Sequence, residues 1–324
     1  MNYRNLGKTD LNVSEIGFGA WAIGGNWGDQ DDKDSLAALH KAIDLGINFI
    51  DTAAGYGNGH SERIIGKVLK ERPEEIIVAT KTPPAPGPWP PTPYCRMESR
   101  YPEHYLRQNI EERLQNLGID CIDILQLHTW TRAWNHHPLP FEILQKLREE
   151  GKIRFIGIST PEDDQHSVID LMKNGYVDVV QLIYNIFEQE PVAELLPQAQ
   201  QHQIGTIIRV VFDEGALTGK FVYETTFAAD DFRCNYFAGD RLYRTVERVE
   251  KIKQDIKDTG LTMPQVALRF VLDHPAVGTV IPGIRNSSQA EQNVFVSELP
   301  PLSETVHLRL RKHAWRRAFW YAGK

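Results

Sequence analysis

The sequence predicts an α/β fold in which eight parallel strands, separated by helices, close into a (β/α)8 TIM barrel with an N-terminal β-hairpin and a C-terminal helix. Short β-branched runs alternate with helical patterns along most of the chain. No linker interrupts this alternation, so residues 1–324 are expected to form one domain. A doubly wound sheet is the rival architecture, but no predicted strand leads into a GxGxxG turn and a helix.

The elements follow one another in a regular order. The hairpin is expected over residues 3–14, with Gly7-Lys8-Thr9-Asp10 in its middle. The eight strands are predicted at residues 15–19, 48–51, 76–81, 122–128, 154–159, 177–182, 206–211 and 277–281. Helices are predicted at residues 34–45, 61–70, 103–117, 139–150, 161–173, 192–201 and 241–259. Two irregular stretches, residues 83–93 and 222–239, are expected as loops over the carboxyl ends of the strands.

Composition narrows the class of protein. With 41% hydrophobic residues, 24% charged residues and a net charge of −7, the chain is typical of a soluble globular protein and does not favour nucleic acid as a partner. The basic cluster at residues 309–317 is interpreted as a solvated helix face. Without an apolar leader or membrane-length segment, the protein is expected in the cytoplasm. Cys95, Cys121 and Cys234 are far apart, so neither a disulfide framework nor a metal site is predicted.

Polar residues stand at the ends of consecutive predicted strands. They are Asp51, Lys81, His128, Ser159 and Gln181, which end or nearly end strands two to six. In a closed barrel these strand ends surround one opening, so the side chains are expected to meet there. Each residue alone is better explained as a satisfied polar strand end, whereas all of them together favour a site. Tyr56 follows in a glycine-rich loop that can turn its ring inward.

These residue types suit the reduction of a carbonyl group. The carbonyl oxygen needs a proton as hydride reaches the carbon, and a phenol with an ordinary pKa near 10 is a weak donor. A charged Lys81 beside Tyr56 is expected to lower its pKa, and Asp51 to hold that ammonium group in place. His128 can hydrogen-bond the substrate oxygen and orient it. A hydrolase is less well supported, because no nucleophile elbow or clustered metal ligands are present.

Three segments also resemble the catalytic blocks of the aldo-keto reductase superfamily. They are residues 49–57 (FIDTAAGYG), 78–81 (VATK) and 125–128 (LQLH), in the same order and at similar spacing. The resemblance extends from RNLG at residues 4–7 to residues 289–293. It implies that Tyr56 is the general acid, that Lys81 and Asp51 support it, and that His128 orients the carbonyl.

The resemblance also implies a nicotinamide dinucleotide cofactor. Residues 157–160 (GIST) resemble the turn that holds the nicotinamide carboxamide, with Thr160 in place of the usual asparagine. Residues 215–220 (GALTGK) resemble the segment that wraps the pyrophosphate, and residues 281–293 the adenosine-binding segment. NADP(H) is favoured over NAD(H) because Arg285 can supply a charge that Gly283 and Gln289 lack. The implied cofactor residues are Gly19, Ala20, Asp51, Ser159, Thr160, Gln181, Arg209, Val210, Phe212, Lys220, Gly283, Arg285, Gln289 and Asn293.

Arg209 departs from the family pattern, because it falls where another side chain usually packs on the nicotinamide ring. Two interpretations stay open: it pairs with Asp213, Glu214 or another nearby acid, or its charge disfavours the cationic oxidised cofactor. The substrate is expected to be a small carbonyl compound, in a pocket lined by Trp21, Trp27 and Trp130.

Two further functions remain open at this point. Some chains that resemble this superfamily act as cofactor-binding regulatory subunits of membrane proteins, and a sugar epimerase could use the same site. All four catalytic positions are filled, which favours a reductase. The sequence makes no prediction of the oligomeric state.

Overall fold

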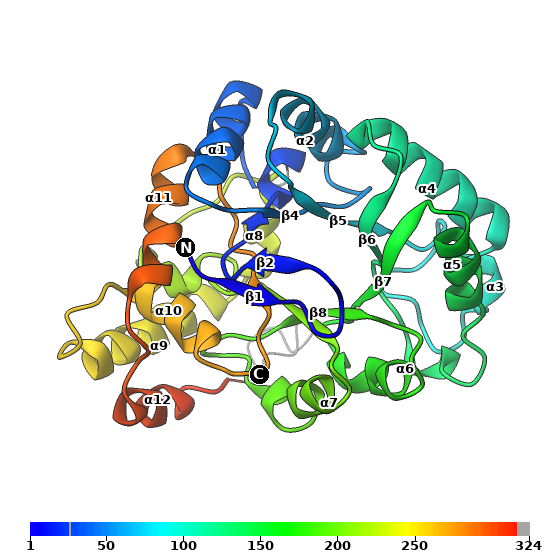
Figure 1. Ribbon diagram of the computed structural model, residues 1–324. Coiled ribbons are helices and arrows are strands. Elements are labelled where there is room, and N and C mark those ends of the chain that lie inside the picture. Colours follow the sequence, from blue (N-terminus) through cyan, green and yellow to red (C-terminus); the bar gives the residue numbers. More distant parts are fainter. Residues whose placement is uncertain (26, 316–324) are drawn as a thin grey trace.

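A computed structural model describes residues 1–25 and 27–315. Figure 1 looks along the axis of the central sheet, with helices arranged around its outside. The sheet has eight parallel strands in the order β10-β9-β8-β7-β6-β5-β4-β3. Their bounds are β3 Phe18–Gly19, β4 Phe49–Asp51, β5 Ile77–Thr82, β6 Ile122–Leu127, β7 Ile153–Ser159, β8 Val179–Ile183, β9 Gly205–Arg209 and β10 Thr279–Val280. Every predicted strand is therefore present.

Two isolated parallel bridges join the outer strands of this sheet. They pair Ile16 with Val280 and Gly19 with Gly283. The Gly17 amide donates to the Val280 carbonyl at 2.7 Å, and the Gly19 amide donates to the Pro282 carbonyl at 3.0 Å. The sheet thus closes on itself, and the predicted barrel is confirmed.

The helices lie outside the strands and are bounded by ordinary capping residues. Asp31, Asn286 and Ser303 cap α1, α11 and α12 by accepting backbone N–H groups, and Gly118 ends α4 with φ of 68°. The bounds are α1 Asp32–Asp44, α2 His60–Glu71, α3 Met97–Arg100, α4 Glu103–Leu117, α5 Leu139–Glu149, α6 Ile169–Lys173, α7 Leu195–Gln201, α8 Phe232–Tyr236, α9 Arg241–Ile256, α10 Met263–Leu272, α11 Ser287–Phe295 and α12 Glu304–Arg311.

The largest difference from the predicted helices is at residues 161–173. The α-helix covers only Ile169–Lys173 and follows a 3-10 turn over Gln165–Val168. Gln165 accounts for the late start, because its side chain bonds both the amide and the carbonyl of Ile183 and so fixes the chain against β8. Helix α10 was not among the predicted helices. Its Thr262 and Gln265 form a capping box that marks its beginning.

The hairpin of β1 (Tyr3–Asn5) and β2 (Asn12–Ser14) covers one end of the barrel, as Figure 1 shows. Buried residues of the hairpin pack with inward-facing residues of the strands: Leu6, Leu11, Val13, Phe49, Ile77, Ala79, Ile124, Val179, Ile207 and Ile281. The turn lies so close to β9 that a Cβ at Gly7 would stand 2.2 Å from the Gly205 nitrogen. This end is closed, so a site can open only at the carboxyl ends of the strands.

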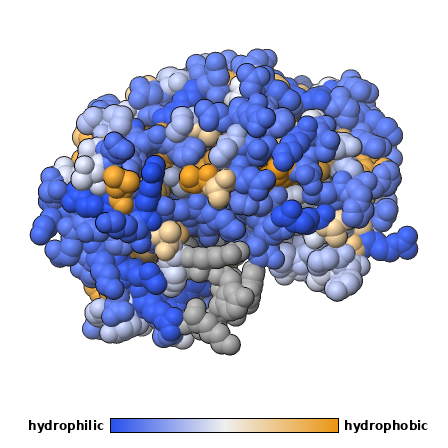
Figure 2. Space-filling model, turned by 90° about the horizontal axis from the view of Figure 1, so that it is seen from below, coloured by the Kyte–Doolittle hydropathy of each residue, from blue (hydrophilic) through white to orange (hydrophobic). Residues whose placement is uncertain are grey.

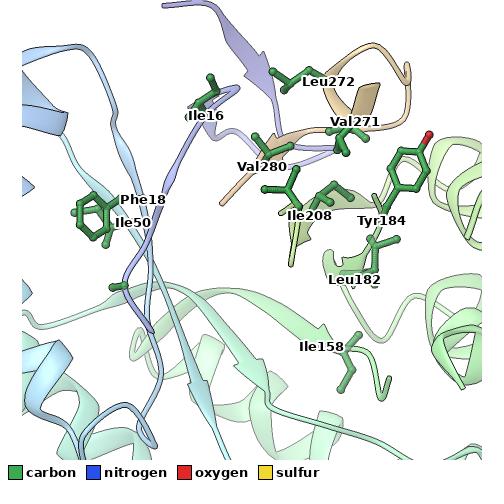
Figure 3. Packing of buried hydrophobic residues seen from close by; sticks show 14 of the residues in the cluster. Ile16, Phe18, Ile50, Ile158, Leu182, Tyr184, Ile208, Val271, Leu272 and Val280 are labelled. Carbon is green, nitrogen blue, oxygen red and sulfur yellow. The ribbon is translucent and has the colours of Figure 1, made fainter. Parts of the chain in front are cut away.

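A second and larger core fills the layer between strands and helices. Figure 3 shows Ile208 and Val280 of neighbouring strands beside Val271 of α10, and all three are fully buried. Burying apolar surface on both sides of the strands is the main stabilisation expected for a barrel of this kind. The rigid strand ends that result are a firm base for polar side chains.

The basic residues near the C-terminus are paired more than the sequence suggested. His307 bonds Asp273 at 2.9 Å, and Arg309 pairs with Asp258 at 3.0 Å. His313 bonds Asp255 at 2.8 Å. These are surface ion pairs, since Arg309 is 28% and its partner Asp258 60% exposed, so they are compatible with the predicted solvated face. Arg316 and Arg317 lie outside the described residues.

The surface is predominantly polar in the view from below. Figure 2 shows hydrophilic residues over most of that face, with small and separate hydrophobic patches. Within the described part of the chain, no helix combines the length and apolar character needed to cross a membrane.

Candidate active site

The strand register brings the polar strand ends together, opposite the hairpin. Asp51 ends β4, Lys81 is the penultimate residue of β5, and Ser159 pairs in register with Gln181 across β7 and β8. His128 follows β6 directly, and its amide donates to the Thr82 carbonyl at 2.9 Å. All five predicted positions are therefore on neighbouring strands at one end of the barrel.

Lys81 is the centre of this group. Its ammonium group donates to Asp51 Oδ1 at 2.5 Å, to the Thr52 carbonyl at 2.8 Å and to the Tyr56 hydroxyl at 3.4 Å. Tyr56 is presented by a tight loop in which Gly57 and Gly59 have φ of 60° and 77°, a region that glycine adopts without strain. The structure thus joins the carboxylate, the ammonium and the phenol in one line of contacts.

The charges of Lys81 and Tyr56 depend on their burial. Burial lowers the pKa of Lys81, but Asp51 and Tyr56 raise it by more, so the group stays an ammonium ion. Burial raises the pKa of Tyr56, and the lowering effects of Lys81 and Arg209 are smaller. The expected net fall of the Tyr56 pKa was wrong, because desolvation of the phenolate outweighs the nearby cations. The phenol therefore keeps its proton.

His128 is neutral in this setting. Burial, together with the positive charges of Lys81 and Arg209, holds its pKa well below the ordinary value. Its ring lies edge-on to Tyr56 with 6.1 Å between ring centres, and Trp89 packs on it at 5.5 Å. A neutral imidazole beside a protonated phenol can donate a hydrogen bond to a substrate oxygen while the phenol supplies a proton.

Asp51 has two additional partners. Gln181 donates to Asp51 Oδ2 at 2.7 Å, and Gln126 donates to the same oxygen at 3.2 Å. The sequence prediction missed Gln126, although a signal was present: Ile122, Ile124 and Gln126 alternate along β6, and the last is polar at an inward position.

Arg209 ends β9 and is largely buried. It donates to the Thr160 carbonyl at 3.1 Å and to Glu162 at 3.4 Å. Its acidic partner is thus Glu162 rather than Asp213 or Glu214. Thr160 is therefore held at two atoms: its carbonyl accepts from Arg209, and its hydroxyl donates to Gln165.

The segment after β9 has an unusual backbone. Val210, Asp213 and Glu214 have φ of 57°, 52° and 54°, which is the left-handed region. Such a conformation costs on the order of 1–3 kcal/mol for a residue other than glycine and is concentrated at functional sites. Asn185 donates to the Val210 carbonyl at 2.8 Å and helps to fix it. Of the other predicted residues here, Phe212 is half-buried and Lys220 is exposed.

Glu214 is a buried carboxyl group in this segment. Burial and repulsion from Glu162 raise its pKa to about 8, although Arg209, Arg233 and Arg241 oppose the rise. The folded protein therefore binds this proton more tightly than the unfolded chain. Between the ordinary pKa and about pH 8, the free energy of unfolding falls as pH rises.

Replacing Glu214 with glutamine is expected to stabilise the protein above about pH 8, by on the order of a few kcal/mol, and to have little effect near pH 4. The gain arises because the variant has no carboxylate to desolvate. Urea denaturation across this pH range measures the effect, with the exposed Glu149→Gln as control. A variant whose stability follows that of the parent protein at every pH would contradict this account of Glu214.

The segment after β10 contains the predicted adenosine-binding residues. Arg285 donates to the Gln30 side chain at 2.9 Å and to the Asp29 carbonyl at 2.5 Å, and its amide donates to Gln289. Asn293 is buried in α11, whereas a Cβ at Gly283 would face open space. The open space and the polar groups beside it fit one end of a dinucleotide.

Gly19 and Ala20 form the base of the opening on the β3 side. A Cβ at Gly19 would stand 2.6 Å from the Ile281 carbonyl, so a larger residue does not fit there. The Ala20 amide donates to the Asp51 carbonyl at 2.9 Å. These contacts align β3 with the strand that carries Asp51.

Aromatic side chains stand beside Tyr56. Trp21 lies 6.5 Å from Tyr56 between ring centres, 5.6 Å from Trp27 and 5.3 Å from Phe232. The Arg233 guanidinium lies over the Trp27 ring at 4.4 Å. Phe232 joins this wall, although it was not among the predicted pocket residues, while Trp89 packs against His128.

Trp130 is not part of this wall. It is 1% exposed, its ring packs on Trp134 and Phe141 at 5.2 Å from each, and its indole N–H donates to Asn135 at 2.7 Å. The predicted pocket role of Trp130 is corrected to that of a core residue. Its contacts lie behind β6 with α5, where apolar burial and one satisfied N–H explain the ring.

The described residues contain no group of three or more histidine, cysteine or acidic side chains that could hold a metal ion.

Comparison with known proteins agrees with this geometry. The model of the Aldo/keto reductase family matches residues 15–314, and the chain belongs to that family. It is 33% identical over 301 residues to Aldo-keto reductase YhdN of Bacillus subtilis (strain 168), covering 90% of this chain and 87% of the relative. It is 29% identical over 320 residues to the NADH-specific methylglyoxal reductase of Escherichia coli (strain K12), covering 89% and 91% of the two chains.

Solved structures show the same architecture. The holo form of aldo-keto reductase AKR11C1 from Bacillus halodurans aligns with a TM-score of 0.76 at 26% identity, over 97% of this chain and 96% of the other. The glycerol dehydrogenase AKR11B4 from Gluconobacter oxydans aligns with a TM-score of 0.77 at 28% identity, over 98% and 97%. A probable voltage-gated potassium channel subunit beta of Arabidopsis thaliana is also similar, at 28% identity over 95% of this chain and 94% of the relative.

Proposed function

We propose that the protein is an NAD(P)H-dependent reductase of an aldehyde, ketone or sugar carbonyl, with Tyr56 as the general acid. The observation that carries the proposal is the 3.4 Å contact between the ammonium of the buried Lys81 and the hydroxyl of the partly buried Tyr56. Protonated phenol, charged lysine and neutral imidazole are the forms that reduction requires.

The residues divide the work of proton transfer. A bound nicotinamide supplies the hydride. Tyr56 donates its proton to the carbonyl oxygen, and the neutral His128 hydrogen-bonds that oxygen and orients it. Lys81 then stabilises the tyrosinate that remains, and Asp51 keeps the ammonium in place through the 2.5 Å contact. Because burial raises the pKa of Tyr56, the resting site is in the proton-donating form.

The cofactor is proposed to lie across the opening, from Arg209 and Gln181 to the segment after β10. NADP(H) is favoured over NAD(H), because Arg285 can turn from Gln30 and Asp29 to a 2′-phosphate. The NADH-specific name of one relative keeps NAD(H) as the second candidate. We place the reaction in the cytoplasm, since the three cysteines are free and lie apart.

A fluorescence titration with NADPH and NADH, followed by a panel of aldehydes, ketones and sugars, tests the proposal. Tight binding with cofactor oxidation supports the reductase. Tight binding without turnover on any carbonyl would favour a regulatory subunit, for which the similarity to potassium channel beta subunits is the supporting observation. Turnover of a sugar without net cofactor oxidation would indicate an epimerase, and the products would identify it.

Replacing Arg209 with leucine is expected to tighten the oxidised cofactor roughly tenfold relative to the reduced one. The reason is electrostatic: a guanidinium beside a nicotinamide disfavours the cationic form. A tenfold ratio corresponds to about 1.4 kcal/mol, within the ~4 kcal/mol of two unit charges ~4 Å apart near a protein surface. The ratio of the two dissociation constants measures it. Arg132→Leu, which removes a more exposed pair with Asp164, is the control. An unchanged ratio would exclude this role of Arg209.

A further inference from the structure

Gln126 is a buried amide in the interior of the barrel. It lies on β6 with 0% exposure, and Ile122, Ile124, Leu125 and Leu127 of the same strand are apolar and buried. Its Nε2 donates to Asp51 Oδ2 at 3.2 Å. Its Oε1 has no hydrogen-bond partner among the residues that the structure describes.

Stability alone does not account for such a residue. A buried carbonyl oxygen without a partner costs about 1–3 kcal/mol, whereas methionine has nearly the same shape without that loss. The donated bond to Asp51 offsets part of this cost only because Asp51 is itself buried and charged. The amide is therefore best explained by what it does for Asp51.

The neighbouring strand leaves room for this side chain. Gly157 of β7 pairs with Gln126 in the sheet, and a Cβ at Gly157 would stand 2.7 Å from Gln126 Cγ. That position is also 3.3 Å from the Val179 carbonyl, so a side chain at 157 would have to displace Gln126. The absence of a side chain at Gly157 therefore allows Gln126 to reach Asp51.

The Asp51 carboxylate receives donors on both oxygens. Oδ1 accepts from Lys81 at 2.5 Å, and Oδ2 accepts from Gln181 at 2.7 Å and from Gln126 at 3.2 Å. These donors come from three different strands, so the plane of the carboxylate is fixed. The direction in which Oδ1 points decides where the Lys81 ammonium lies.

We propose that Gln126 is a positioning residue: with Gln181 it forms an amide clamp on Asp51 Oδ2, which orients Asp51 so that Lys81 is held against Tyr56. This inference rests on the proposed reductase function and adds a residue to its machinery. Gln126 acts through Asp51 and does not touch the substrate.

Replacing Gln126 with methionine tests the clamp. We expect kcat to fall at least about tenfold, because the supporting ammonium loses its fixed position. The dissociation constant of the reduced cofactor should stay within about twofold of the parent value. Gln126 lies in the barrel interior and contacts Asp51 rather than the opening. The midpoint of thermal unfolding should stay unchanged or rise, because the variant has no unpartnered oxygen.

The pH profile separates this role from a structural one. Burial lowers the pKa of Lys81, and Asp51 and Tyr56 together raise it by more, so misplacing Asp51 lowers the pKa of Lys81. Lys81 then lowers the pKa of Tyr56 by less, so the alkaline limb of the kcat profile, which reports loss of the Tyr56 proton, should move to higher pH in Gln126→Met. Gly157→Ala should reproduce the same shift through displacement of Gln126.

Thr82→Val is the matched control. Thr82 is fully buried beside Lys81, and its hydroxyl also has no partner among the described residues, but it does not contact Asp51. Its activity and pH profile should match those of the parent protein. Parent-like turnover and pH profile in Gln126→Met, or a fall of several degrees in its unfolding midpoint, would overturn the proposal.

Failure of the reductase function is distinguishable from failure of the clamp. If the parent protein oxidises neither reduced cofactor, the proposed function fails, and the clamp is tested without cofactor by ultraviolet titration of Tyr56 as the difference from Tyr56→Phe. A higher Tyr56 pKa in Gln126→Met supports the clamp, because Lys81 lowers that pKa in the parent protein. An unchanged titration overturns it.

Discussion

Replacing Tyr56 with phenylalanine is expected to lower turnover by at least about two orders of magnitude and to leave cofactor binding nearly unchanged. The hydroxyl is the only group that this substitution removes, and its partner Lys81 keeps its contacts with Asp51 and Thr52. Stopped-flow measurement of cofactor oxidation gives the rate, and a fluorescence titration gives the affinity.

Tyr105→Phe is the control for this substitution. Its hydroxyl also donates a hydrogen bond, to the Pro83 carbonyl at 3.1 Å, but it is outside the group around Lys81. That variant should keep its turnover. Turnover of Tyr56→Phe near that of the parent protein would remove Tyr56 from the proposed mechanism.

The second large effect is expected from Lys81→Met. The side chains of Lys81 and Asp51 are 1% and 3% exposed, so removal of the ammonium leaves a buried carboxylate without its cation. Loss of one partner of a buried pair costs about 3–5 kcal/mol of folding stability, and turnover should fall with it because the tyrosinate is no longer stabilised. Urea denaturation measures the first effect and cofactor oxidation the second.

Lys152→Met provides the comparison, because its partner Glu111 is half exposed and such surface pairs contribute no more than about 1 kcal/mol. If Lys81→Met were as stable as Lys152→Met, the amide donors to Asp51 would be sufficient to hold the charge. The lysine would then have a role in catalysis alone.

The order of strands and the residues at their ends could be predicted because both are local patterns. A β-branched run followed by Asp51 or Lys81 appears directly in the sequence, and the barrel brings neighbouring strand ends together by its register. Helix α6 was predicted too long because its start depends on a long-range contact. The Gln165 side chain bonds the backbone of Ile183 in β8, and a local pattern does not reveal such a bond.

Side-chain partners were harder to predict than positions. Trp130 and Trp21 both follow strands, but only the depth of packing shows that the first belongs to the core. The sign of the Tyr56 pKa shift also depends on depth, since burial competes with the charge of Lys81. Gln126 was missed because its role depends on the absence of a side chain at Gly157 of the next strand.

The hairpin makes the two ends of the barrel different, because it covers one end and leaves the other open. Figure 1 places the N-terminus at the end covered by β1 and β2, where the Gly7 turn packs against β9. An affinity tag, fluorophore or surface linker attached before Met1 would therefore project away from the opening that contains Tyr56. Molecules immobilised in this way should present that opening to the solution, which suits a sensor for reduced cofactor or for carbonyl compounds.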